Sequence, residues 1–283
     1  MPIGVPHLRA LVAVAETGGF GAAASRLGIS QSAVSHAVAS LERIAGRSVL
    51  IREGIPRPTP LGERMLEHAR TAVAAVSAVE ELASRRNHHV RAELTLAAPP
   101  TVCHGLLPAL LTRWRADFPE VRIALFEGED DDVASWLDGA VADLAVLVDP
   151  PAGIGRLLGS DGFHAVLRTD HPLAGLAEVD LADLADDELL LSTGGCERQI
   201  RELHRAAGTP FVPRHRVRQL STLFSMVAAG LGVSVVPGLA DGMQGPDVVL
   251  VPLTQRLRRT LVLTGPRSRP WHPVATALIE VAC

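Results

Sequence analysis

The stretch AAASRLGISQSAVSHAVASLERIAG, residues 22–46, constrains the fold most, because a glycine separates two patterns of helical residues. Gly28 can adopt the left-handed backbone that ends one helix, and Ser30 can cap the next by accepting a hydrogen bond from an early backbone N–H. The second pattern carries apolar residues at helical spacing, namely Val34, Val38 and Leu41. Two short helices joined by a tight turn, a helix-turn-helix, are therefore predicted.

The second helix of this pair has a polar outward face. We expect its apolar stripe to pack against Leu27 and Ile29. This leaves the polar residues of its first turns exposed, where a recognition helix meets base edges in the major groove. Glutamine and serine can both donate and accept hydrogen bonds there. An ordinary solvated face is the alternative interpretation. The predicted DNA-reading residues are Ser30, Gln31, Ser32, Ser35 and His36.

A basic segment rich in proline follows the helix pair. Residues 49–51 have the composition of a short strand, and Arg52 and Arg57 flank a bend. We predict a two-stranded wing in which Arg52, Arg57 and Thr59 contact DNA, with the arginines on phosphate, where they add affinity without sequence information. A basic surface loop is the alternative. Residues 1–90 hold 10 Arg and 7 Glu, a net charge of +3, and the remainder holds 17 Arg and 24 acidic residues, a net −7. This asymmetry is compatible with nucleic acid at one end only.

Residues 59–86 predict one long helix. Apolar residues recur every three or four positions, at Leu61, Met65, Ala69, Ala72, Val76, Val79 and Leu82. A narrow apolar stripe on so long a helix needs a partner, and a second copy of the chain is the simplest one. A dimer suits a reader of two half-sites. Residues 85–89, RRNHH, predict a polar hinge, in which His88 and His89 lack companion ligands at metal-site spacing.

After residue 92 the pattern alternates between strands and helices. Strands are predicted at 94–100, 121–129, 143–148, 164–168, 189–193, 215–220, 232–237, 248–253 and 260–266. Helices are predicted between most of them, and a terminal helix closes the chain. This alternation favours parallel sheets, with ligands at the carboxyl ends of the strands.

Together these residues resemble LysR-type transcriptional regulators. The motif FGAAASRLGISQSAVSHAVASLERIAG is similar to the DNA-binding domain of that family. The likeness rests on Ala23-Ala24 with Leu27, Ser30-Gln31, Ser35 and Leu41-Glu42. The segments LLPALLTRWRADFPEVRIAL and AGLGVSVVP are similar to its effector domain, so the resemblance covers essentially the whole chain. Ser32 stands where the family often has proline, and His36 stands where it often has arginine.

The resemblance implies an α+β and α/β multidomain chain. A winged helix-turn-helix domain covers 1–58, a dimerising linker helix and hinge cover 59–90, and a two-lobed effector domain of the periplasmic-binding-protein type covers 91–283. Lobe I takes about 91–160 and 266–283, and lobe II about 161–265. The implied function is a transcriptional regulator that binds double-stranded promoter DNA as a homodimer or homotetramer. Contact with RNA polymerase is left open. A small effector between the lobes would change promoter binding or activation.

The effector cleft is assigned from the strand ends. Backbone N–H groups at three helix starts can bind an anion and nearby hydroxyls can orient it, although the same hydroxyls can simply cap helices. Glu127 opposes a strongly anionic ligand, so a small polar or aromatic metabolite is expected. The candidate effector-binding residues are Pro100, Thr101, Cys103, Glu127, Thr193, Gly194, Ser221 and Thr222.

Three alternatives stay open. An α/β enzyme is opposed by Ser234, which lacks the G-x-S-x-G frame of a nucleophile elbow, and a metabolite-binding protein without DNA binding is opposed by the N-terminal helices. A thiol sensor can use Cys103 and Cys196 if a thiol is exposed and has a low pKa. No catalytic residue, metal or cofactor is predicted. The chain has no apolar run of about 18 residues and no secretory signal, so we expect no membrane partner and a cytoplasmic location.

Overall fold

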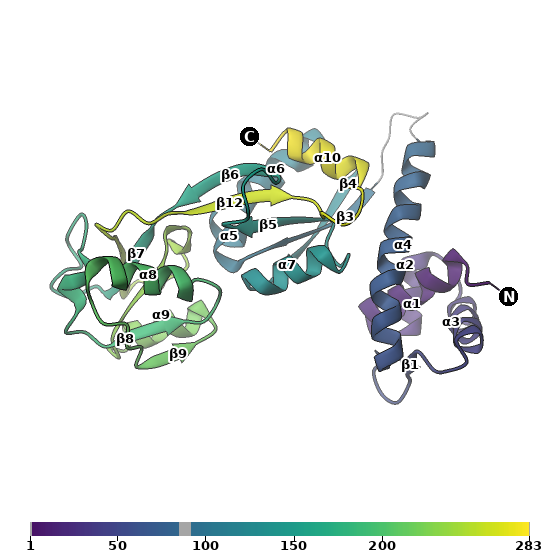
Figure 1. Ribbon diagram of the computed structural model, residues 1–283, viewed down its shortest axis with the longest axis horizontal. Helices are drawn as coiled ribbons and strands as arrows, with labels where there is room; N and C mark the ends of the chain where they lie inside the picture. Colours follow the sequence, from purple (N-terminus) through teal and green to yellow (C-terminus); the bar gives the residue numbers. More distant parts are fainter. Residues whose placement is uncertain (1, 85–91, 283) are drawn as a thin grey trace.

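The computed structural model describes residues 2–84 and 92–282, in which an N-terminal helical domain is followed by two α/β lobes (Figure 1). The predicted hinge at 85–89, with His88 and His89, lies outside the described residues. Within the described ranges, the longest helices are too short or too polar to cross a lipid bilayer.

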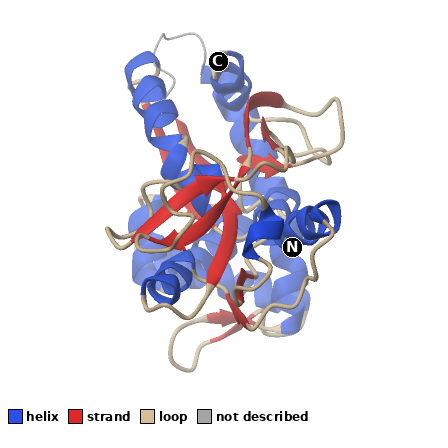
Figure 2. Ribbon diagram, turned by 90° about the vertical axis from the view of Figure 1, so that its left-hand side faces the viewer, coloured by secondary structure: helices blue, strands red, loops and turns tan. Residues whose placement is uncertain are grey.

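The N-terminal domain contains three helices and a small wing: α1 (Val5–Thr17), α2 (Phe20–Leu27), α3 (Gln31–Ala45), β1 (Leu50–Ile51) and β2 (Arg57–Pro58). Gly28 ends α2 in the left-handed conformation, at a φ of 66°. The Ile29 N–H donates to the Ala24 carbonyl oxygen at 3.1 Å, which closes the turn. The wing strands pair antiparallel, and the wing lies at the lower end of the molecule in Figure 2. The predicted winged helix-turn-helix is confirmed.

One face of each helix builds the core of this domain. Val34, Val38 and Leu41 of α3 are fully buried against the alanines of α2 and the apolar face of α1. Leu27 packs at the edge of this core, as expected. The expected packing of Ile29 is wrong. Its side chain is 47% exposed, because the residue serves the turn through its backbone while its side chain points to solvent.

Helix α4 (Pro60–Ser84) uses part of its apolar stripe inside the subunit. Met65, Ala69 and Val73 pack into the core of the N-terminal domain, against α1. Val79, by contrast, is 66% exposed. The part of the apolar stripe that remains available to pack against a second copy of the chain is therefore shorter than the sequence suggests, and it begins after Val73.

The first lobe is a five-stranded sheet with helices on both faces. Its elements are β3 (Ala92–Ala98), α5 (Pro100–Gly105), α6 (Leu107–Asp117), β4 (Val121–Glu127), α7 (Asp130–Asp138), β5 (Leu144–Val148), β6 (Arg156–Asp161), β12 (Arg259–Thr264) and α10 (Pro273–Glu280). The strand order is β4-β3-β5-β12-β6. Helices α5, α6 and α10 cover one face, where Trp114 Nε1 donates to the Leu278 carbonyl oxygen at 3.2 Å, and α7 covers the other.

The second lobe repeats this plan. Its elements are β7 (Phe163–Arg168), η1 (Leu181–Leu184), β8 (Leu189–Ser192), α8 (Glu197–Ala207), β9 (His215–Val217), α9 (Leu220–Ala228), β10 (Val233–Pro237), η2 (Gly238–Ala240) and β11 (Val248–Pro252). The strand order is β11-β7-β10-β8-β9. Helix α8 and η1 pack on one face of the sheet, and α9 packs on the other.

The chain passes between the lobes twice, after β6 and before β12 (Figure 1). Because β12 pairs with β5 and β6, residues 259–264 belong to the first lobe, and the boundary expected at 265 and 266 lies too late. The expected parallel pairing holds for β3 with β4 and β5, and for β8 with β9 and β10. It is wrong for β12 and β7, which run antiparallel to their neighbours, since a strand that has just crossed enters its sheet from the opposite end.

Gly62 offers a test of how α4 is attached to the wing. A Cβ at this position would overlap the Val49 carbonyl oxygen, which also accepts the Thr59 N–H. We expect Gly62→Ala to lower the free energy of unfolding by about 1 to 3 kcal/mol, as overpacking does. Gly21→Ala in α2 is the matched control. Its Cβ would meet only ordinary contacts, so it should be neutral or stabilising through helix propensity. Calorimetry of the full chain that found equal melting temperatures for the two variants would contradict this attachment.

Candidate functional site

The predicted DNA-reading residues gather on the first two turns of α3. Ser30 caps the helix, because its Oγ accepts a hydrogen bond from the Ala33 N–H at 3.2 Å. The same Oγ lies 2.9 Å from Ser32 Oγ. The remaining side chains of this face are exposed or half-buried: Gln31, Ser32, Ser35 and His36. Helical spacing therefore brings these residues together on one accessible polar surface.

Glu42 fixes the wing to α3. Its Oε1 accepts hydrogen bonds from the backbone N–H groups of Val49, at 3.0 Å, and Leu50, at 3.4 Å. Its Oε2 accepts from Arg52 Nη2 at 2.6 Å, and the Arg52 guanidinium lies 5.7 Å from the centroid of the Phe20 ring. The positive charge of Arg52 is thus matched by Glu42, so Arg52 holds the wing in place in addition to any contact with phosphate.

The other two wing residues differ from each other. The Arg57 side chain is exposed and makes no hydrogen bond or ion pair within the described ranges. The Thr59 hydroxyl donates to the Ser48 carbonyl oxygen at 3.0 Å and accepts from the Gly62 N–H at 3.1 Å. Thr59 therefore caps α4, and its hydroxyl has a structural use that the sequence prediction did not include.

Two further arginines belong with this surface. Arg43 and Arg47 are exposed, and neither makes an ion pair inside residues 2–84 and 92–282. Arg43 lies seven residues after His36 on α3, which is two helical turns along the same face. The helical repeat from His36 to Arg43 is a signal in the sequence that assigns Arg43 to this face.

A cavity of about 210 Å³ lies between the two lobes. Five of the predicted effector-binding residues line it: Pro100, Thr101, Glu127, Gly194 and Ser221. Three do not. The Cys103 Sγ donates to the Ala98 carbonyl oxygen of its own lobe, the Thr193 N–H donates to the Val217 carbonyl oxygen, and Thr222 lies outside the lining. Other residues outside this candidate set also line the cavity, namely Glu129, Asp130, Ser192, Cys196, Arg218, Val235, Met243 and Arg259.

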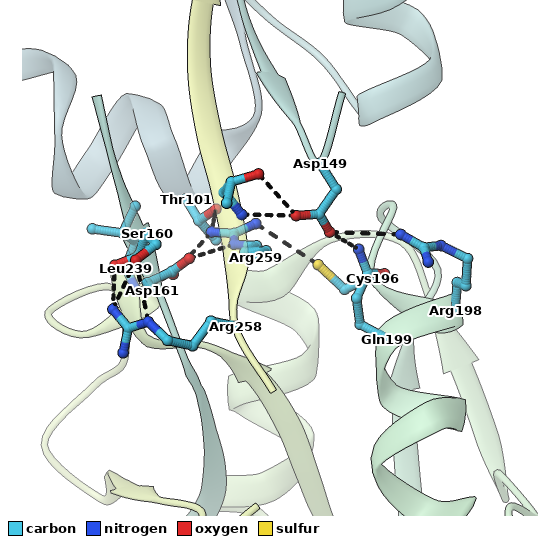
Figure 3. Close-up of polar contacts among 11 residues, drawn as sticks. Thr101, Asp149, Ser160, Asp161, Cys196, Arg198, Gln199, Leu239, Arg258 and Arg259 are labelled. Carbon is cyan, nitrogen blue, oxygen red and sulfur yellow. Dashed lines mark hydrogen bonds and ion pairs between the residues drawn. The ribbon is translucent and has the colours of Figure 1, made fainter. Parts of the chain in front are cut away.

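Arg259 is part of the lining of this cavity. Its polar contacts connect the two lobes (Figure 3). Its side chain is 1% exposed. Its Nε donates to Asp161 Oδ1 at 2.7 Å, and its Nη2 donates to Thr101 Oγ1 at 2.8 Å. Its Nη1 lies 3.8 Å from Cys196 Sγ in the second lobe. Asp161 in turn accepts from the Leu239 N–H of the second lobe at 3.0 Å. Asp161 ends β6 and Arg259 begins β12, so this ion pair joins the two segments that cross between the lobes and has partners in both lobes.

Asp149 makes a second connection between the lobes. Its Oδ1 accepts from the Thr260 N–H at 2.7 Å, and its Oδ2 accepts from Gln199 Nε2 of α8 at 3.0 Å (Figure 3). Arg198 lies 3.5 Å from the same oxygen. Asp149 itself has a φ of 47°, an uncommon backbone conformation for a residue with a side chain. Its carboxylate thus joins the end of β5 to the start of α8.

Glu129 and Asp130 of the first lobe lie close to the turn at Gly194 and Gly195 of the second lobe. A Cβ at Gly194 would lie 2.5 Å from Glu129 Oε2, and one at Gly195 would lie 2.7 Å from Asp130 Oδ2. Gly195, with a φ of 89°, is favoured as glycine by its backbone as well as by this close approach, whereas a side chain at Gly194 would require Glu129 to move. Burial raises the pKa of Asp130 to about 6, and the nearby carboxylates add to this effect while Arg259 opposes it.

The cysteines and Ser234 bear on the alternative functions. Burial raises the pKa of both Cys103 and Cys196 to about 12, and Arg259 beside Cys196 opposes this shift without cancelling it. Neither thiol is therefore a ready nucleophile at neutral pH. Ser234 is fully buried in β10, and its Oγ donates to the Leu190 carbonyl oxygen at 2.7 Å. That serine is not placed to attack a substrate.

Asp130 makes stability depend on pH. Burial raises its pKa in the folded chain from the ordinary value for an aspartate to about 6, so the folded state binds more protons between about pH 4 and 6, and stability falls as pH rises through that window. Asp130→Asn removes the charge. We expect the variant to be more stable than the wild type above pH 6, by up to about 3 kcal/mol, and similar below pH 4. Thermal unfolding at several pH values tests this. Asp131→Asn, an exposed neighbour, is the control, and a parallel pH dependence in the wild type and Asp130→Asn would refute the assignment.

Comparisons with known proteins agree with this geometry. Two protein-family models match the chain. The family described as bacterial regulatory helix-turn-helix protein, lysR family, matches residues 5–63, and the family described as LysR substrate binding domain matches residues 87–282. The uncharacterized HTH-type transcriptional regulator YvbU of Bacillus subtilis is 28% identical, over 98% of this chain and 97% of its own length. A probable hydrogen peroxide-inducible genes activator of Mycobacterium avium is 33% identical, over 82% of this chain and 77% of its own.

Solved structures show the same arrangement. Full-length OxyR from Pseudomonas aeruginosa, in a variant with a cysteine changed to aspartate, is similar over 100% of this chain and 95% of that one. The TM-score is 0.76 and the identity is 26%. The two matched ranges correspond to the helix-turn-helix domain and to the two lobes around the cavity. The chain therefore belongs to the LysR family of bacterial transcriptional regulators.

Proposed function

We propose that this chain reads promoter DNA with α3 and its wing, and that a small molecule bound between the lobes changes that binding. The observation that carries the proposal is the presence of two separate sites in one chain. One is an exposed polar face at the start of α3, and the other is a cavity whose walls come from both lobes. A family match over both parts supports their joint use.

On the DNA side, Gln31 and Ser35 contact base edges, where an amide can bind two groups of one base. Arg43, Arg47 and Arg57 contact phosphates and fix the position of the domain on the duplex. Their exposure and the lack of ion pairs within the described residues support this division. The competing interpretation of α3 as a solvated surface does not explain why Glu42 holds a basic wing beside it.

A second copy of the chain completes the DNA-binding unit. The part of α4 after Val73 carries Val76 and the exposed Val79, which packing against another α4 would cover. Pairing two subunits places two α3 helices on two half-sites of the duplex. A homodimer is the smallest assembly that does this, and a homotetramer doubles it.

In the effector domain, binding is coupled to the arrangement of the lobes. Arg218 of the second lobe pairs with Asp132 of the first at 3.0 Å, and Gln199 bonds to Asp149 across the same gap. A ligand in the cavity changes DNA binding only if it binds one arrangement of these lobes better than another. We assign the chain no catalytic role, in keeping with its relatives, which are transcriptional regulators. As a promoter-binding protein it acts in the cytoplasm, beside the chromosome.

Retention of the DNA upstream of the chain's own gene tests this proposal. We expect Gln31→Ala to weaken specific binding by about 1 to 3 kcal/mol while leaving nonspecific binding unchanged. Arg57→Gln should weaken binding to all sequences and reduce the slope of log affinity against log salt by about one. Arg122→Gln, which makes the same charge change on the exposed edge of β4, is the control. Equal affinity for specific and random DNA in the wild type would refute the proposal.

A second candidate function is peroxide sensing at Cys196. It is favoured by the relatives named as hydrogen peroxide-inducible genes activators and by the position of Cys196 on the cavity, beside Arg259. Peroxide would oxidise the thiol to a sulfenic acid and release water. The raised pKa of Cys196 opposes this reaction, because the thiolate is the reacting form. Cys103 lies outside the cavity lining, so a sensor that uses both thiols has little support.

Exposure of the full chain to hydrogen peroxide separates the two candidates. We expect Cys196 to stay reduced at neutral pH, as measured by mass spectrometry of alkylated peptides, and DNA binding to stay unchanged. Rapid oxidation of Cys196 together with a change in DNA affinity that is lost in Cys196→Ser, but kept in Cys103→Ser, would instead establish the peroxide sensor.

A further inference from the structure

We propose that the second lobe holds a further small-molecule site, whose ligand is a neutral, largely apolar molecule with one hydroxyl group, such as a phenol. The site is a second cavity of about 450 Å³, a volume within the range of small-molecule sites. The cavity between the lobes lies at the carboxyl ends of β8 and β10, whereas the second cavity lies at their amino ends, where Leu189 and Val233 line it. Val235 lines both cavities, which are therefore neighbours. This inference goes beyond the proposed function and does not depend on it.

Most of the lining of the second cavity is apolar, and it comes from three parts of the lobe. Strands β8 and β10 contribute buried residues, η1 contributes two leucines, and the segment 209–214 between α8 and β9 contributes the rest. The apolar lining includes Leu181, Leu184, Leu189, Val212, Val233 and Val235. Contact with such a surface favours an apolar molecule, because it removes apolar area of both partners from water.

A polar side chain of this lining is buried and only partly satisfied. His204, in the last turn of α8, is 7% exposed. Its Nδ1 lies 2.9 Å from Thr209 Oγ1, and its ring packs edge to face against Phe211. Its Nε2 is buried as well, and it has no hydrogen-bond partner among the described residues. A buried polar atom without a partner is unfavourable, so a ligand that supplies the missing hydrogen bond gains affinity.

A hydroxyl group is the partner that fits Nε2 in either tautomer of the imidazole. The Thr209 hydroxyl either donates to Nδ1 or accepts from it, so Nε2 either carries a proton or is free to accept one. A hydroxyl both donates and accepts, and it therefore bonds to Nε2 in both cases. Burial lowers the pKa of His204, and the Pro210 carbonyl oxygen opposes this shift. The imidazole is thus neutral at pH 7 and does not attract an anion.

The charged residues of the lining also favour a neutral ligand. Asp187 lies 3.4 Å from His171 Nε2, and Glu188 lies 3.8 Å from Arg214 Nε. The Arg214 side chain is 67% exposed, so water screens its charge. A carboxylate ligand would meet these two acidic residues and would lose its own hydration among leucine and valine side chains.

Binding at Nε2 involves a shift of the segment 209–214. The atom is shielded from water in the described conformation, and Thr209 and Phe211 of this segment contact the imidazole. The segment has neither helix nor strand, and Pro210 and Val212 within it are exposed. It can therefore move without breaking a helix or a sheet, and the hydroxyl of a ligand in the cavity then replaces the missing partner of Nε2.

Three probes with one ring test the inference on the full chain by titration calorimetry at pH 7. We expect phenol to bind, and benzene and benzoate to bind about tenfold more weakly or not at all. Ala185→Leu adds a side chain to the lining of the cavity and should abolish phenol binding. Ala182→Leu is the matched control, because Ala182 is equally exposed in η1 but lies outside the lining. His204→Phe keeps a ring and removes both nitrogens, so it should weaken phenol about tenfold and leave benzene unchanged.

Phenol binding that Ala185→Leu leaves intact places the ligand elsewhere, the cavity between the lobes included, and overturns the inference. Stronger binding of benzoate than of phenol overturns it too, as does equal binding of benzene and phenol or no binding of phenol at all. Circular dichroism of each variant distinguishes lost binding from lost folding. If His204→Phe does not fold, the three probes and the two exposed alanine positions still decide the outcome.

Discussion

The ion pair between Arg259 and Asp161 is the interaction on which the effector domain depends. A guanidinium so deeply buried is tolerated only when hydrogen-bonding partners surround it, and these partners come from different parts of the chain. Asp161 lies at the first strand crossing, Thr101 at the end of β3, and Cys196 at the start of α8. Arg259 is fully satisfied only when both lobes are folded and in place. Folding of each lobe and the shape of the cleft are therefore coupled through one side chain.

Much of the fold is predictable from the sequence, because it follows from local spacing. The stripe of Val34, Val38 and Leu41 and the glycine at position 28 suffice for the helix-turn-helix, since each acts through its own helix or turn. Most strand positions follow from apolar runs in the same way, but β6 (Arg156–Asp161) was not predicted, because only Leu157 and Leu158 of its six residues are apolar side chains. The direction of the strands beside the lobe crossings does not follow in this way, because it depends on the route by which the chain returns.

The site was predicted less completely. The ends of the strands locate the cavity, but they do not say which side chain faces it, and Cys103, Thr193 and Thr222 lie just beyond its lining. Arg259 was missed because one arginine beside an apolar strand carries no local signal, and its partner Asp161 is far away in sequence. Glu42 is similar. The Leu41-Glu42 motif is visible, yet its use as an acceptor for wing N–H groups appears only in three dimensions.

The pairing of the two connecting strands limits how the lobes can move. β6 and β12 are neighbours in the first sheet, and β7 and β11 are neighbours in the second, so the outgoing and returning segments run side by side. Two adjacent connecting segments can bend together. Such bending permits rotation of the lobes about one axis and resists sliding of one lobe past the other. The paired strands therefore favour a hinge motion of the lobes over sliding, and under the proposed function a change in the angle between the lobes is what would reach the DNA-binding domains.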